Sequence, residues 1–107
     1  MKSKAIGTLL LAVVASSAMA SEITVISFGG VSKDVQSQAF YKPFEKATGN
    51  QLIAGEYNGE MGRIKVMVDT DSVNWDVVQV EAPELIRGCD EGMFEPLDAA
   101  QLGKAED

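Results

Sequence analysis

The chain has 107 residues, with 16 acidic and 9 basic side chains and a formal charge of −7. Nucleic acids and anionic membranes are bound through clustered Lys and Arg, so this balance argues against both as partners. Histidine is absent, which excludes a Ser-His-Asp triad, a Cys-His pair and a histidine-ligated metal within these residues.

The first 20 residues have the order of a secretory signal peptide. Lys2 and Lys4 precede an apolar run over 5–15, and Ala18-Met19-Ala20 has the small-x-small cleavage pattern. The run is too short to span a bilayer, and no cysteine near residue 20 could carry a lipid anchor. The sequence therefore predicts a signal peptide over 1–20 and a periplasmic, unanchored mature part over 21–107.

The mature part begins with a strand and a long helix. Apolar, β-branched residues predict a strand over 23–28, which ends at Gly29-Gly30. Helix-spaced apolar residues follow from residue 32, and Pro43 predicts a break near Tyr41-Lys42 because proline clashes inside a helix. Gly49-Asn50 then supplies a left-handed helix end.

Two further strand-helix pairs follow. The pattern predicts a strand over 51–57, a turn at 58–59, a helix over 60–69 and a buried strand over 76–80. Pro83 then opens a third helix at its first position, and Gly92 ends it. The side chains expected to face the core are Met61, Ile64 and Val68 on the helix over 60–69, and Leu85, Ile86 and Cys89 on the third helix.

The alternation of strands and helices predicts an α/β fold with parallel strands in the order 2-1-3. Three parallel strands leave two unpaired edges, and 101–107 carries no terminating feature. We therefore expect a partial three-layer lobe of a larger domain, of marginal stability and without useful ligand affinity by itself.

Ligands of open parallel sheets bind beyond the carboxyl ends of the strands. The stretches that meet there are 27–30, 56–58 and 79–81. Gly29-Gly30 fits neither a dinucleotide fingerprint nor a P-loop, so the pair is either a backbone ledge for a ligand or a tight corner without one. Tyr57 and Glu81 suit an amine or guanidine, although Glu81 at a helix start could equally be a solvated charge.

Other motifs carry no chemistry. The segment 69–74 lacks the oxygen ligand and the glycine of a calcium loop, and Trp75-Asp76 is interpreted as packing plus a turn cap at the far end from the crevice. No two carboxylates can be placed across a common substrate. The sequence thus predicts no catalytic residue, no metal site and no cofactor.

Four blocks nevertheless resemble one protein family, in order and spacing: VISFGG (25–30), FYKPFEKATG (40–49), WDVVQVEAPEL (75–85) and GCDEGMFEPLDAAQLG (88–103). They are similar to bacterial extracellular solute-binding proteins of ABC importers, and to the spermidine/putrescine-type group within them. The resemblance implies a type II periplasmic-binding-protein fold, in which this chain is the first part of lobe one. It also implies a receptor that closes on its ligand and delivers it to an inner-membrane permease.

The same resemblance implies site residues and a disulfide. Ligand contacts of the family carry over to the loop after the first strand and to the loop after the third. The compatible ligands are a polyamine, another amine, an opine or an amino-acid derivative. A cysteine beyond Asp107 is the implied disulfide partner of Cys89. The implied contact residues are Phe28, Gly29, Gly30, Glu81 and Ala82.

Two rival hypotheses stay open on the sequence. The chain could be an enzyme half-domain that binds a phosphorylated substrate at Gly29-Gly30, or a non-functional, truncated remnant. Binding of an unaltered amine to the complete protein would favour the receptor, and turnover would favour the enzyme.

Overall fold

The computed structural model describes residues 19–103, so most of the predicted signal peptide lies outside the described residues. The described part contains three strands and five helical segments, none of them long and apolar enough to cross a membrane. In chain order these are β1 (Glu22–Phe28), α1 (Val31–Gln36), the π-helix η1 (Ser37–Tyr41), α2 (Lys42–Thr48), β2 (Gln51–Tyr57), α3 (Met61–Asp69), β3 (Val77–Val78) and α4 (Ala82–Asp90).

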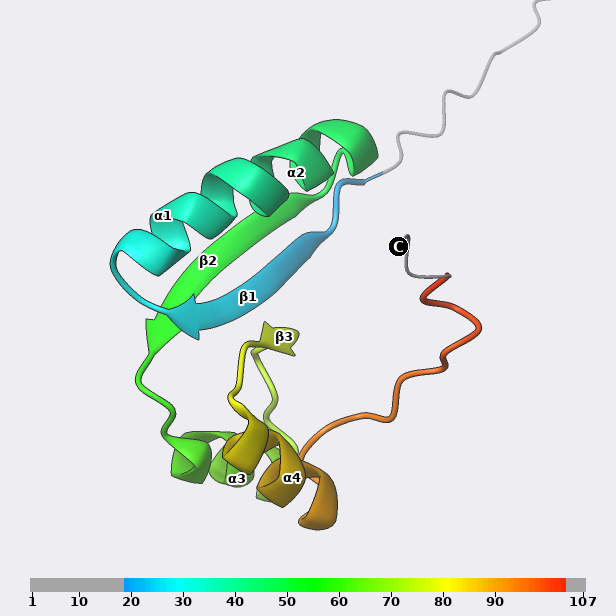
Figure 1. Ribbon diagram of the computed structural model, residues 1–107. Coiled ribbons are helices and arrows are strands. Elements are labelled where there is room, and N and C mark those ends of the chain that lie inside the picture. Colours follow the sequence, from blue (N-terminus) through cyan, green and yellow to red (C-terminus); the bar gives the residue numbers. More distant parts are fainter. Residues whose placement is uncertain (1–18, 104–107) are drawn as a thin grey trace, which may run out of the picture.

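The strands form one parallel sheet in the order β2-β1-β3, as predicted. β1 lies in the centre and pairs with β2 in continuous register from Glu22↔Gln51 to Phe28↔Tyr57. Helices α1 and α2 run along one face of the sheet, and α3 and α4 lie beyond the other (Figure 1). The carboxyl ends of all three strands therefore point to the same edge of the fold.

The break predicted at Pro43 is confirmed and takes the form of a π-helical turn. Inside an α-helix, the ring of Pro43 would clash with the carbonyl four residues earlier, at Ala39. The i→i+5 pattern of η1 widens the helix just before that point, and the chain continues as α2. Gly49 ends α2 at φ 74°, and its N–H donates to the carbonyl of Glu45 at 2.9 Å.

The core lies between the sheet and α3. Met61 and Ile64 are buried, as predicted, whereas the third inward position of α3 is taken by Met67 and Val68 packs beside it half-buried. Methionine is unbranched and fills the irregular space under a three-stranded sheet. The buried cluster is Ile26, Tyr57, Met61, Ile64, Met67 and Met93.

The prediction of a buried five-residue strand over 76–80 is wrong. β3 has two residues, and the side chain of Val77 is 52% exposed. Hydrogen bonds from Asp76 N to Thr24 O (3.1 Å) and from Gln79 N to Ile26 O (2.8 Å) continue the pairing with β1 on either side. Within the described residues β3 has a neighbour on one side only, which leaves its second edge and much of one face uncovered.

Two predictions for α4 are also wrong. The helix begins at Ala82, so Pro83 is its second residue, and Leu85 and Ile86 are 49% and 64% exposed. Cys89 is exposed as well. The residue that α4 buries is Gly88, which lies against the ring of Phe94. No described element covers the apolar stripe on the other side of the helix, so its side chains stay exposed.

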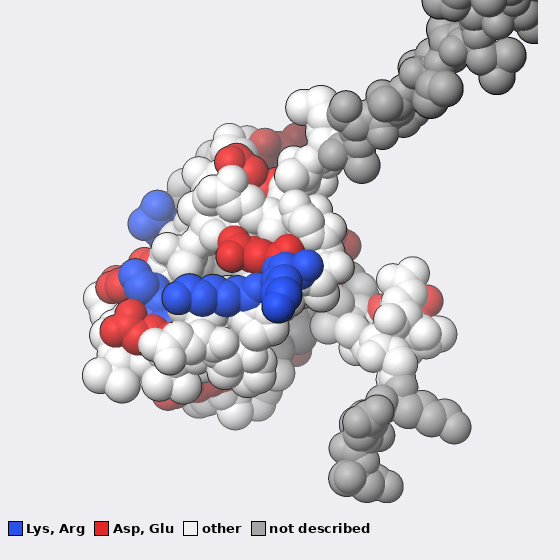
Figure 2. Space-filling view, turned by 90° about the horizontal axis from the view of Figure 1, so that it is seen from above, with Lys and Arg blue, Asp and Glu red and all other residues white. Residues whose placement is uncertain are grey.

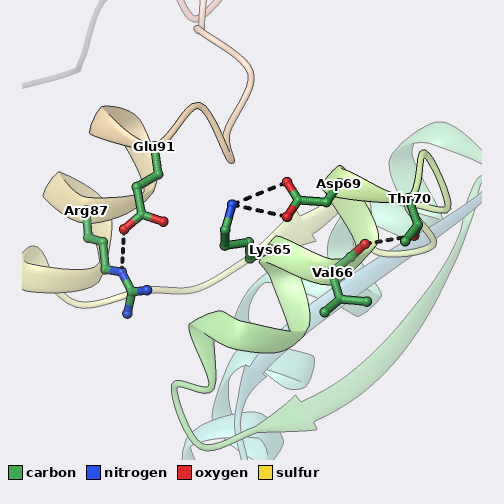
Figure 3. A network of polar contacts seen from close by, with 6 residues as sticks. All are labelled: Lys65, Val66, Asp69, Thr70, Arg87 and Glu91. Carbon is green, nitrogen blue, oxygen red and sulfur yellow. Dashed lines mark hydrogen bonds and ion pairs between the residues drawn. The ribbon is translucent and has the colours of Figure 1, made fainter.

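Charged pairs hold each helix internally and do not join α3 to α4. Lys65–Asp69 lies along α3 and Arg87–Glu91 along α4, each pair spaced i,i+4 (Figure 3). Exposed pairs of this spacing contribute about 0.3–0.5 kcal/mol. The arrangement of the two helices therefore depends on apolar packing.

Candidate ligand-binding site

The carboxyl edge of the sheet has an aromatic floor. Phe28 and Tyr57 are paired in register, and their rings stack with centroids 5.4 Å apart at 22°. Tyr57 is only 5% exposed, and its hydroxyl donates to the backbone carbonyl of Gln79. The predicted site residue Tyr57 is thus buried at this edge, and Phe28, its partner in the sheet, is half-buried.

Trp75 also reaches this floor. Its ring meets Tyr57 edge-on with centroids 5.8 Å apart, and the guanidinium of Arg63 lies 4.6 Å from the ring centroid of Trp75. The packing role predicted for Trp75 is confirmed, but its side chain is not confined to the far end of the sheet. The turn cap predicted for Asp76 is wrong, since its carboxylate accepts from Thr24 N–H on β1 at 2.7 Å.

The glycine pair presents bare backbone beside an ion pair. Gly30 is exposed and starts α1 at φ 68° and ψ −144°, a conformation that L side chains rarely adopt. A Cβ on Gly29 would overlap the carboxylate of Glu56, which pairs with Lys33 at 2.5 Å. This hydrogen bond to Glu56 raises the pKa of Lys33 above its ordinary 10.5. Gly30 therefore has a conformational reason to be glycine, whereas a side chain at Gly29 would instead displace the Glu56 carboxylate.

Glu81 and Ala82 follow β3 at the same edge. Glu81 is the N-cap of α4, and within the described residues its exposed carboxylate forms no side-chain hydrogen bond or ion pair. One oxygen of Glu84 is buried without a described hydrogen-bond partner. Burial, followed by the negative charges of Glu84, Glu60 and Glu81, raises the pKa of Tyr57 above 10.0. Carboxylates are thus concentrated around the aromatic floor.

The acidic side chains of this edge are not equivalent. Glu60 caps the turn before α3 by accepting from Asn58 N–H at 2.8 Å, which lowers the pKa of Glu60 below 4.5. Glu56 is engaged by Lys33. Neither Glu81 nor Glu84 has a side-chain partner among the described residues, and Glu81 is the exposed one of the two. On the face seen in Figure 2, acidic and basic side chains lie close to one another.

Side chains that the sequence reasoning did not single out complete the edge. Gln36 Nε2 donates to Gln79 Oε1 at 2.9 Å, and the hydroxyl of Tyr41 donates to Gln36 Oε1 at 2.9 Å. Gln36 and Lys33 lie one helical turn apart on α1, directly after the glycine pair, and that position was the available signal for them. No sequence signal pointed to Tyr41, because its contact depends on the π turn.

Two apolar hollows of the described chain lie away from this edge. One, of about 500 Å³, lies under η1 and α2 near the amino ends of the strands. The other, of about 810 Å³, lies between α3, β3 and α4 and includes Cys89. No group of His, Cys, Asp and Glu within residues 19–103 could hold a metal ion. The disulfide predicted for Cys89 involves a residue outside this chain and stays a prediction.

Comparison with known proteins connects this chain to solute-binding proteins. The chain is 60% identical over 89 residues to the gamma-aminobutyric acid-binding protein of Pseudomonas aeruginosa. This match covers 83% of the chain and 25% of the relative, so the chain spans about a quarter of the relative's length. Over the matched residues it is a homologue of a solute-binding protein. No protein-family model matches the chain.

Two solved structures share the fold. The periplasmic binding protein AgtB from A. tumefaciens R10, in complex with agropinic acid, matches with a TM-score of 0.71 and 30% identity over 77% of this chain and 26% of its own. The Atu4243-GABA receptor matches with a TM-score of 0.69 and 30% identity over 74% of this chain and 24% of its own. The relatives are binding proteins and a receptor, and the mixed α/β fold with parallel order 2-1-3 is theirs.

Proposed function

We propose that the chain forms the first wall of a periplasmic receptor that captures a small solute carrying an amine, and that GABA is the ligand to test first. The observation that carries the proposal is the exposed carboxylate of Glu81, which has no partner among the described residues and follows β3 at the same edge of the sheet as the backbone of Gly29-Gly30. A carboxylate that is not committed to a cation of its own protein can accept hydrogen bonds from a ligand ammonium. The 60% identical relative, named for binding GABA, supports this choice of ligand.

Each predicted site residue has a role in the proposal. Glu81 pairs with the ammonium, and the backbone of Gly29 and Gly30 lies along the ligand chain. Phe28 and the buried Tyr57 give the wall an apolar backing, and Ala82 leaves room beside the first turn of α4. Exclusion of water requires a second wall, supplied by the rest of a protein about four times as long as this match.

Putrescine distinguishes the proposal from the polyamine hypothesis. Putrescine has two ammonium groups, whereas GABA has one ammonium and one carboxylate. Opines such as agropinic acid form a third class. The same proposal includes export directed by residues 1–20 and delivery of the captured solute to an ABC permease. Export predicts that the mature protein is found in the osmotic-shock fraction of the cells.

The test is a chimera in which this chain replaces the matched 89 residues of the Pseudomonas relative. We expect calorimetric GABA affinity within about tenfold of the relative's, and a Glu81→Gln change should weaken it by roughly 10- to 100-fold, the range of one charge-assisted hydrogen bond. Asp90→Asn, at the other end of the same helix, is the matched control and should change nothing.

A chimera that unfolds cooperatively but binds no GABA would overturn the proposal, and equal affinities for the Glu81→Gln and Asp90→Asn variants would overturn the role of Glu81. A direct titration of the 15N-labelled chain with GABA provides a second measurement that does not depend on the chimera. A single wall is expected to bind weakly, with the shifts confined to residues 28–30 and 81–82.

A further inference from the structure

Gln79 presents an unused donor at the carboxyl edge. Its side-chain oxygen accepts from Gln36, and its backbone carbonyl accepts from the hydroxyl of Tyr57. Its backbone N–H donates to Ile26 O on β1 at 2.8 Å. The side-chain NH₂ is therefore the one polar group of Gln79 without a partner among the described residues, and Gln79 is exposed.

In the structure, the hydrogen bonds of this arrangement run in one direction from Tyr41. A phenolic hydroxyl has one proton, and Tyr41 gives it to Gln36 Oε1. Gln36 must then offer its NH₂ to Gln79, which accepts through Oε1 and turns its own NH₂ outward. The chain Tyr41–Gln36–Gln79 thus sets which end of the last amide a ligand meets.

The π turn makes this chain possible. Tyr41 and Gln36 are five residues apart. In a regular α-helix the neighbours on one face are three and four apart, and residues five apart diverge. The i→i+5 pattern of η1 brings Tyr41 back under Gln36. The π turn before Pro43 therefore has a consequence at the carboxyl edge.

We infer that the Gln79 side-chain amide binds the carboxylate end of the ligand, with Gln36 and Tyr41 as positioning residues. The inference rests on the proposed function, in which Glu81 takes the ammonium. Gln79 and Glu81 are two residues apart in the segment between β3 and α4, so both lie at the carboxyl edge of the sheet. A donor and a carboxylate at one edge match a ligand with one group of each charge, and a diamine matches only half of the pair.

Half-ligands provide the test in the 15N-labelled chimera, which supplies the second wall, because butyrate keeps the carboxylate of GABA and butylamine keeps the amine. The side-chain NH₂ of Gln79 gives its own signals in a 15N-correlated spectrum, assigned by their loss in Gln79→Leu. We expect GABA and butyrate to shift these signals and butylamine to leave them in place. Gln38, an exposed glutamine of η1, is the matched control and should not respond.

Each other outcome is decisive. A shift with butylamine but not with butyrate would mean that Gln79 offers its oxygen, and the inference would be wrong. Shifts at residues 28–30 and 81–82 with a silent Gln79 would overturn the inference and leave the proposed function standing. Silence everywhere would remove the proposed function, and the inference with it.

Tyr41→Phe separates positioning from simple stabilisation. Without the hydroxyl, the amides of Gln36 and Gln79 are free to turn, so butylamine should begin to shift the Gln79 signals while the butyrate response falls at least twofold. A structural role alone would lower the unfolding temperature without changing which half-ligand is detected. Unchanged selectivity in Tyr41→Phe would exclude the positioning role.

Discussion

The hydroxyl of Tyr57 donates to the backbone carbonyl of Gln79, and this bond joins the two outer strands of the sheet across the central one. Tyr57 ends β2 and Gln79 follows β3, so neither could reach the other through the strand ladder. The buried side chain of Tyr57 therefore fixes the positions, relative to each other, of the two loops that border the candidate site.

Tyr57→Phe tests this bond. The ring and its stacking on Phe28 stay, but the Gln79 carbonyl loses its partner, so the free energy of unfolding should fall by about 1–2 kcal/mol. Urea denaturation measures the loss. Tyr41→Phe breaks a more exposed hydrogen bond and should lower the free energy of unfolding by less. Equal decreases in the two variants would argue against a special role for Tyr57.

The raised pKa of Tyr57 predicts a late alkaline transition. Burial disfavours its phenolate, and the charges of Glu84, Glu60 and Glu81 add to this effect. Because the folded pKa lies above the unfolded value of 10.0, stability is intact below pH 10 and falls as the pH rises through the folded pKa. The difference between the tyrosinate absorbance titrations of the wild type and Tyr57→Phe should have its midpoint above 10, and a midpoint at or below 10 would contradict the burial.

The Lys33–Glu56 pair makes a second alkaline prediction. The hydrogen bond from Lys33 raises its pKa above 10.5, so the contribution of the pair is complete below that pH and is lost above it. The 13Cε resonance of Lys33 should titrate late, and Glu56→Gln should bring its midpoint down. Gly29→Ala should act in the same direction, because the new methyl group displaces the Glu56 carboxylate. A Lys33 midpoint that ignores both changes would rule out the pairing in solution.

Two helical glycines predict opposite effects of the same substitution. A Cβ on Gly88 would overlap the ring of Phe94, so Gly88→Ala should destabilise by about 1–3 kcal/mol through overpacking. A Cβ on Gly62 meets nothing within 4 Å, so Gly62→Ala should stabilise α3 by up to about 1 kcal/mol. Thermal unfolding of both variants decides the matter. Stabilisation by both would mean that α4 does not pack on Phe94.

Local signals predicted most of this fold. A β-branched run that ends at a glycine pair located β1, a short segment between two Gly/Asn turns located β2, Pro43 located the irregular turn, and Gly49 the end of α2. These features depend on residues near in sequence, which is why pattern reasoning finds them. The parallel order 2-1-3 follows from the alternation of strands with helices.

The wrong predictions concern which apolar faces are covered by another element of the fold. Leu85 and Ile86 have helical spacing typical of an inward face, yet periodicity shows only that a face is apolar and not that another element lies on it. Topology placed the candidate site residues at one edge of the sheet, and the structure brings them to that edge, but their local contacts were not predicted. The buried position of Tyr57 and the Gln36–Tyr41 contact depend on tertiary packing and on a π turn, which a single sequence does not encode in any short motif.

The central position of β1 has a consequence for the order of events during synthesis. β1 is made first, yet its contact with the segment around β3 joins Thr24 to Asp76, 52 residues later. At about 5–20 residues per second, the first strand waits roughly 3–10 s before that partner exists. Non-local parallel pairing of this kind folds slowly. The nascent chain is therefore expected to stay open to proteases and to chaperones until β3 has been made.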